Sequence, residues 1–179
     1  MIFGDIRQIA FVVTDIDEAM EHWAMTMGVG PFFIKRRIEL SDYRYRGQAE
    51  VSPTISIALA NSGFIQIELI QQHDDRASIY KDFLDRYPGG LQHVSSWLTR
   101  DAFDRKKQEL QKAGLSISQE GTIASSGVRL AYFSTDGKQG SMMFEIADLL
   151  EPEHYERVMG IRAAAEQWDG RQVVREVAH

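Results

Sequence analysis

The feature that most constrains the fold is an internal repetition of one order of elements. The apolar run Ile6–Val13 predicts a β-strand, and Thr14 and Asp15 follow it as candidate helix caps. A helical apolar stripe then begins at Ile16 and stops at Gly28, a residue suited to a left-handed helix end. Three strands are predicted next, over residues 32–40, 53–60 and 64–70, with Asn61-Ser62-Gly63 as the turn between the last two.

The second half of the chain repeats this order. Residues 91–98 predict a strand, Thr99 is a candidate cap, and an apolar stripe from Phe103 to Ala113 ends at Gly114. Three further strands are predicted over residues 115–123, 128–134 and 141–149.

The two halves align at a nearly constant offset, which indicates a duplication. The glycines that end the two helices are 86 residues apart. We therefore predict an α+β fold of two tandem β-α-β-β-β modules, over residues 1–72 and 89–150, joined by a connector over 73–88. Three pairs of residues lie 85 positions apart: Gly4 and Gly89, Gln8 and His93, and Thr14 and Thr99.

The C-terminal segment, residues 151–179, stands outside the repeat. Residues 152–170 predict an extra helix, which we expect to pack on the outside of the domain or on a second subunit. Residues 171–179 show no strong pattern. The apolar stripe of the helix contains Tyr155, Val158, Ile161, Ala165 and Trp168.

Composition excludes several classes of function. The chain carries 26 acidic and 20 basic residues, and this net charge of −6 argues against nucleic acid and anionic membrane as partners. It has no cysteine, so disulfides, thiolate metal sites and a cysteine nucleophile are excluded. No apolar run approaches the roughly 20 residues that span a bilayer, and the first five residues lack the pattern of a signal peptide. We therefore expect a cytoplasmic protein.

Each of the five histidines can be considered individually as a ligand. We expect His22, His154 and His179 to be solvated, because they lie off the apolar stripe of the first helix, in the first turn of the last helix and at the chain end. His73, in the polar connector, is a weak ligand candidate. His93 lies inside a predicted strand, where a histidine is either a hydrogen-bonded core residue or a ligand.

Two glutamates interrupt otherwise apolar strands at matching places in the two halves. Glu68 lies in IQIELI and Glu145 in MMFEIA. A buried, unpaired carboxylate costs several kcal/mol, so each must be exposed, protonated, paired or bound to a metal. If the modules are related by a pseudo-two-fold axis, then Gln8, His93 and both glutamates meet inside one cup. The alternative is two edge glutamates and two ordinary strand residues.

The order of four short motifs resembles a known family. QIAFVVTDIDEAMEHW, IQIELI, GGLQHVSSW and MMFEIAD are similar to segments of the vicinal oxygen chelate superfamily, also known as the glyoxalase/bleomycin resistance/dioxygenase superfamily. Its members include glyoxalase I, methylmalonyl-coenzyme A epimerase, extradiol dioxygenases and drug-resistance proteins. The resemblance covers roughly residues 5–149. It implies a cupped, barrel-like mixed sheet and a homodimer, in which the stripe from Tyr155 to Trp168 could form the contact.

The resemblance also implies a metal site. The ligand positions of the family fall on Gln8, Glu68, His93 and Glu145, a set similar to that of the zinc form of glyoxalase I. Glutamine at the first position argues against the two-histidine iron site of the extradiol dioxygenases. The implied cofactor is one divalent ion: zinc, nickel, cobalt or manganese.

This ligand set implies a lyase or isomerase of the glyoxalase type, which moves a proton next to a metal-bound carbonyl of a small-molecule substrate. Glu145 is the expected base, and Glu68 could return the proton. No full match to a glutathione-binding set or a coenzyme A phosphate clamp is found. Two alternatives stay open: an epimerase of acyl-coenzyme A thioesters, and a non-catalytic, drug-sequestering binding protein of the same fold.

Overall fold

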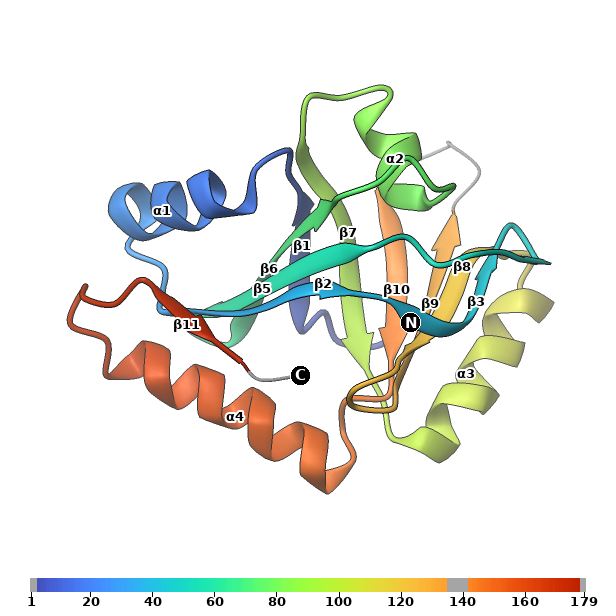
Figure 1. Cartoon of the computed structure of the whole chain (residues 1–179). Helices are drawn as coiled ribbons and strands as arrows, with labels where there is room; N and C mark the ends of the chain where they lie inside the picture. The colour runs from blue at the N-terminus through green and yellow to red at the C-terminus, as the bar shows by residue number, and fades with distance from the viewer. Residues whose placement is uncertain (1–2, 135–141, 178–179) are drawn as a thin grey trace.

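A single curved mixed sheet is the centre of the molecule (Figure 1). The computed structural model describes residues 3–134 and 142–177, and within these ranges the sheet has eleven strands in the order β11-β2-β5-β6-β1-β7-β10-β9-β8-β3-β4. The strands are β1 (Gln8–Val12), β2 (Phe32–Ile38), β3 (Leu40–Tyr45), β4 (Gln48–Ala49), β5 (Ile55–Ser62), β6 (Ile65–Gln72), β7 (Gly90–Trp97), β8 (Ser116–Ile123), β9 (Val128–Ser134), β10 (Met143–Ala147) and β11 (Val174–Glu176). The helices are α1 (Ile16–Met27), α2 (Ile79–Leu84), α3 (Arg100–Lys112) and α4 (Pro152–Glu166).

The register of the two central strands confirms the predicted duplication. Strands β1 and β7 are antiparallel, and Ile9 pairs with Val94, a residue 85 positions later. On the two sides of this pair, β6 runs parallel to β1 and β10 runs parallel to β7. A pseudo-two-fold axis through the central pair therefore relates the two halves of the sheet, as the repeated sequence order requires.

The sheet curves into a cup because one stretch of chain connects its two ends. Strand β2 lies near one end and pairs with β5, whereas β3, one residue further on, pairs with β8 near the other end. Between the two ends of the sheet, the Lys35 ammonium on β2 donates a hydrogen bond to Ser125 Oγ, in the turn between β8 and β9, at 3.0 Å. These links hold the inner faces of both halves toward one interior.

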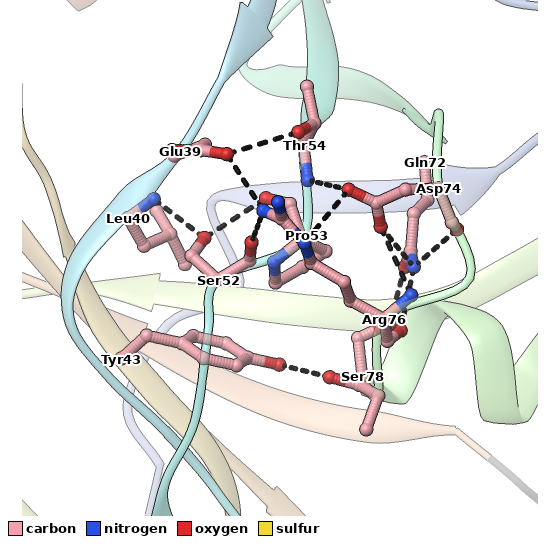
Figure 2. A network of polar contacts seen from close by, with 11 residues as sticks. Glu39, Leu40, Tyr43, Ser52, Pro53, Thr54, Gln72, Asp74, Arg76 and Ser78 are labelled. Atoms are coloured by element: carbon pink, nitrogen blue, oxygen red, sulfur yellow. Dashed lines mark hydrogen bonds and ion pairs between the residues drawn. The ribbon is translucent and has the colours of Figure 1, made fainter.

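A polar network holds the connector that follows β6 against the corner between β2 and β3 (Figure 2). Arg76 Nη1 donates to the carbonyl of Ser52 at 2.6 Å and to Glu39 Oε1 at 2.8 Å. The backbone N–H of Thr54 donates to Asp74 Oδ2 at 2.9 Å. One guanidinium therefore joins three segments that are distant in sequence, and this contact fixes the place where the cup closes.

The expected helix α1 is confirmed together with its caps. Asp15 accepts hydrogen bonds from the N–H groups of Asp17 and Glu18, and Gly28 ends the helix at a φ of 64°. At α3, Thr99 occupies the expected cap position but makes no side-chain cap hydrogen bond.

Within residues 3–134 and 142–177, no helix combines the length and apolar character needed to cross a membrane.

Several elements depart from the sequence prediction. The connector contains helix α2, residues 40–49 contain the short strands β3 and β4, and the tail, for which no pattern was predicted, contains β11. The predicted strand from residue 141 is β10, which begins at Met143. Ser141 and His179 lie outside the described residues.

The C-terminal helix α4 was expected on the outside of the domain or on a second subunit, and it packs against one side of the sheet. It lies along the open side of the cup, in contact with β5 (Figure 1), and its inward side chains line the interior cavity. Val158 and Ile161 are buried as expected, but Tyr155 is 44% exposed, whereas His154 is only 3% exposed. The buried stripe thus begins one residue earlier than predicted, and His154 is not solvated.

Candidate functional site

The inner face of the cup encloses a cavity of about 830 Å³. Polar side chains line it where the two halves meet and again near α4, and much of the remaining wall is apolar. A cavity of this size and character is typical of a site for a small organic molecule. The polar side chains at the meeting point of the two halves are Gln8, Gln66, Glu68, Tyr132 and Glu145.

Strand register explains why the predicted residues come together. Gln8 pairs with Ser95, which pairs in turn with Glu145, so these three residues form one row across β1, β7 and β10. The next row on the same face, two residues further along β1, joins Glu68 and His93 through Ala10, which pairs with both. Because alternate residues of a strand share a face, both rows direct side chains into the cup.

Three of the four predicted residues are in direct proximity. His93 Nε2 lies 3.3 Å from Glu68 Oε2 and 3.8 Å from Glu145 Oε2. His93 is fully buried, and the two glutamates are 7% and 5% exposed. Gln8 is also buried, but its amide Nε2 donates to Gln66 Oε1 at 2.8 Å.

The protonation of the imidazole follows from its neighbour in sequence. His93 Nδ1 lies 2.6 Å from Gln92 Oε1, an oxygen that can only accept, so Nδ1 carries the proton. In the neutral ring, Nε2 then directs a lone pair toward Glu68. Neither His93 Nε2 nor Glu68 Oε2 has a hydrogen-bond partner among the described residues. A proton on Glu68 or a bound cation would satisfy both atoms.

Burial shifts the acid–base properties of the group and makes its two carboxyls unequal. Desolvation raises the pKa of Glu68 to about 8, and no neighbouring group opposes this shift. Desolvation also raises the pKa of Glu145, as does negative charge on Glu68, whereas the hydroxyl groups of Ser95 and Tyr132 lower it, as would positive charge on His93. The pKa of His93 is lowered by burial. At neutral pH and without a cation, Glu68 is thus the protonated carboxyl.

The chemistry of the donors fits a divalent cation, although the side chains are not assembled around one. Within residues 3–134 and 142–177, no group of three or more His, Cys, Asp or Glu side chains could hold a metal ion as it lies. The unsatisfied atoms of Glu68 and His93 are nevertheless an oxygen and a nitrogen, which zinc, nickel, cobalt and manganese accept as ligands. The metal set therefore stays a prediction.

Sequence reasoning missed four polar residues around the cavity. Gln66 and Gln92 were not singled out, although each lies within a predicted strand and is buried. The Tyr132 ring packs edge-on against His93, with a centroid distance of 5.0 Å, and its hydroxyl lies 2.9 Å from that of Tyr80. No pattern in the sequence indicates this contact. The fourth missed residue, His154, lines the cavity from α4.

The weak ligand candidate His73 lies outside the cavity lining. Its Nε2 is 2.7 Å from Ser56 Oγ. Burial lowers its pKa, as does the positive charge of Arg37. His73 is thus a hydrogen-bonding residue of the strand edge in this structure.

Comparison with known families agrees with the fold and the residue order. Residues 7–133 match the profile of the glyoxalase/bleomycin resistance protein/dioxygenase superfamily. Because this match covers most of the chain, the protein belongs to that superfamily. A search of curated proteins finds no significant match.

Solved structures of low sequence identity share the fold. Methylmalonyl-CoA epimerase from Mycobacterium tuberculosis superposes with a TM-score of 0.59 at 17% identity, covering 87% of this chain and 93% of that chain. A hypothetical protein from Bacillus halodurans superposes with a TM-score of 0.58 at 16% identity, covering 82% of this chain and 95% of that chain. A variant of the Streptomyces coelicolor methylmalonyl-CoA epimerase, in complex with 2-nitronate-propionyl-CoA, gives 0.52 at 13% identity, with 82% and 94% covered.

Proposed function

We propose that this chain is an enzyme that removes a proton from the carbon next to a substrate carbonyl and returns it, as a lyase or isomerase. The observation that carries the proposal is the buried group formed by Glu68, His93 and Glu145, in which Nε2 lies within 3.8 Å of both carboxyls. Buried carboxyls with raised pKa values, placed in an apolar cavity, are typical of acid–base catalysis.

The unequal surroundings of the two carboxyls suggest their roles. Glu145 is the base, because the hydroxyl groups of Ser95 and Tyr132 favour its charged form. Glu68 is the acid, because nothing among its neighbours offsets its desolvation. The acid can give its proton to the substrate while the base accepts one, and the reaction leaves the pair ready for the reverse transfer. His93 Nε2 lies 3.3 Å from Glu68 and can accept the proton of its acid form, and Gln92 fixes the orientation of the ring.

A divalent ion would be held by Gln8, Glu68, His93 and Glu145. Gln8 uses its amide nitrogen on Gln66, which leaves its amide oxygen for a ligand. When bound, the ion would polarise the substrate carbonyl and acidify the neighbouring C–H bond. Zinc, nickel, cobalt and manganese all suit this donor set.

Two further functions compete with this proposal. An epimerase of acyl-coenzyme A thioesters also needs two acid–base groups, and structures that share the fold include methylmalonyl-CoA epimerases. A non-catalytic binding protein is favoured by a different observation, the size and the mostly apolar wall of the cavity. A homodimer and a cytoplasmic location remain predictions from the sequence.

Proton exchange with solvent tests the proposed reaction class. Purified protein, loaded separately with each of the four metals, would be incubated in D₂O with α-hydroxy thioesters, 2-oxo aldehyde adducts and acyl-coenzyme A compounds. Proton NMR would then follow loss of the signal next to the carbonyl. We expect exchange with at least one compound. Glu145→Gln should slow it by about 100-fold or more, because an amide cannot accept the proton.

Glu21→Gln, a change of the same chemistry at an exposed position of α1, is the matched control and should leave the exchange rate unchanged. Elemental analysis after gentle purification separates enzyme from binding protein. Metal content well below one ion per chain, with no uptake of the four ions and no exchange with any compound, would support the non-catalytic alternative. Equal rates for the wild type and Glu145→Gln would remove this glutamate from the mechanism.

A further inference from the structure

A second polar group lines the same cavity away from the carboxyls, on the wall formed by α4. Its centre is His154, which is 3% exposed and lines the cavity. Neither of its ring nitrogens has a hydrogen-bond partner among the described residues. A buried imidazole normally pairs at least one nitrogen, so this side chain is suited to a polar group supplied from outside the chain.

Three cations line the cavity together with this histidine. Arg157 follows it by three residues on the same helix face, and Lys35 and Arg175 line the cavity from β2 and β11. Burial lowers the pKa of Lys35, and the positive charge of Arg157 lowers it further, so these two cations lie close enough to repel each other.

Within residues 3–134 and 142–177, none of these three cations has an acidic partner. Lys35 donates to Ser125 Oγ, and Arg175 lies over the ring of Phe33 at 5.4 Å from its centroid. The carboxylate of this wall, Glu176, is engaged by Arg36 at 2.8 Å. Lys35 and Arg157 lie near each other, and Arg157 shares a helix face with the unpaired imidazole of His154, an arrangement that an anion would stabilise.

We infer that His154, Arg157 and Lys35 bind the anionic oxygens of an amphipathic substrate, whose apolar body fills the cavity and whose other end reaches the carboxyls. Phe33, Val158 and Ile161 supply part of the apolar wall between. The substrate class is thus an organic acid or phosphate ester with a hydrocarbon body. This inference rests on the proposed function in one respect, that the cavity is the place where the substrate binds.

Three probes with the same chain and different head groups test the inference: decanoate, decyl phosphate and decanol. Isothermal titration calorimetry on the full-length protein would measure each affinity. We expect at least one anionic probe to bind about tenfold more tightly than the neutral alcohol, because hydrogen bonds to charged groups contribute more than neutral ones. The ratio between decanoate and decyl phosphate identifies the preferred head group. Equal affinity for all three probes, or no binding of either anion, would overturn the inference.

Variants locate the head group. Arg157 is exposed, so its side chain is not needed for core packing. Arg157→Gln should weaken binding of the preferred anion about tenfold and leave the affinity for decanol unchanged. Arg162→Gln is the matched control, since Arg162 lies on the same helix but pairs with Glu166 and does not line the cavity. Equal losses from the two variants would mean general electrostatic attraction and would refute the site. His154→Phe, which keeps an aromatic ring at the buried position, should weaken binding of the anion in the same way as Arg157→Gln.

The failure of this inference is distinguishable from the failure of the proposed function. Glu145→Gln should slow proton exchange by about 100-fold or more but keep the preference for the anionic probe, because Glu145 belongs to the group around His93 and not to α4. Binding of the anionic probe without any proton exchange would leave the anion site standing and reject the catalytic role.

Discussion

Replacing Glu68 by glutamine should stabilise the metal-free protein, although it removes a residue of the proposed site. The pKa of Glu68 is about 8 in the folded state, whereas the usual value of 4.5 applies to the unfolded chain. The folded state therefore binds more protons between these two values, and stability falls as the pH rises through this window. Ionisation of Glu68 in the unfolded chain thus lowers the free energy of unfolding by roughly 3 kcal/mol at pH 7 and by about 5 kcal/mol well above pH 8.

Glutamine does not ionise, so Glu68→Gln avoids this loss of stability. In the wild type, the carboxyl oxygen lies 3.3 Å from His93 Nε2, and the amide N–H of glutamine can donate to the same nitrogen. Urea unfolding in the presence of EDTA, at pH 5, 7 and 9, would measure the free energy of unfolding of both proteins. We expect the variant to be more stable by roughly 3 kcal/mol at pH 7, by more at pH 9 and by about 1 kcal/mol at pH 5.

Glu21→Gln, at an exposed site, controls for the loss of one negative charge and should follow the wild type at each pH. If Glu68→Gln has the same pH dependence as the wild type, or is less stable at pH 7 and pH 9, then Glu68 is not a buried, protonated carboxyl. The reasoning about the acid–base roles would be refuted with it.

Three further predictions concern the scaffold and the metal. Asp15→Ala should lower the free energy of unfolding by about 1 kcal/mol, while Thr99→Ala should have little effect, because only Asp15 makes a side-chain cap bond; urea unfolding of both variants checks this. Arg76→Met should cost roughly 1–3 kcal/mol by the same assay, since it leaves the carbonyl of Ser52, in the segment before β5, without its donor, and an unchanged midpoint would contradict this role. Zinc should raise the melting temperature of the wild type but not that of His93→Gln in EDTA-treated, dialysed samples; equal shifts would place the ion elsewhere.

The repeat could be predicted because its signals are local. Strand runs, a capping aspartate and a helix-ending glycine each occupy short stretches, and the offset of 85 between the halves reappears in the pairing of Ile9 with Val94. The same offset predicts that Gln8 and His93 occupy equivalent positions. The meeting of Glu68 and Glu145 at one imidazole then follows from the symmetry of the sheet.

Strand β3 escaped prediction because its burial pattern is irregular. Leu40 and Tyr43 are its buried positions, three residues apart rather than two or four. Asp42 has a φ of 50°, and the pairing with β8 shifts register between Ser41 and Arg44. This bulge inserts an extra residue and destroys the alternation on which strand prediction depends.

The polar wall on α4 could not be predicted for a different reason. A stripe beginning at Tyr155 and one beginning at His154 both continue through Val158 and Ile161, so the sequence leaves the phase of the helix open. Contact with the cup decides it and buries His154. Strand β11 has only three residues and exists because it pairs with the edge of β2, so it has no local signal.

The state of the His93 ring tests the central claim most directly. Nitrogen-15 NMR of histidine-labelled, metal-free protein, with the His93 signals assigned from the His93→Gln spectrum, reports which ring nitrogen carries the proton. The geometry predicts a neutral ring at pH 7 with the proton on Nδ1, held by Gln92, and with Nε2 accepting from the side of Glu68. A proton on Nε2 instead would contradict the arrangement on which the proposed chemistry depends.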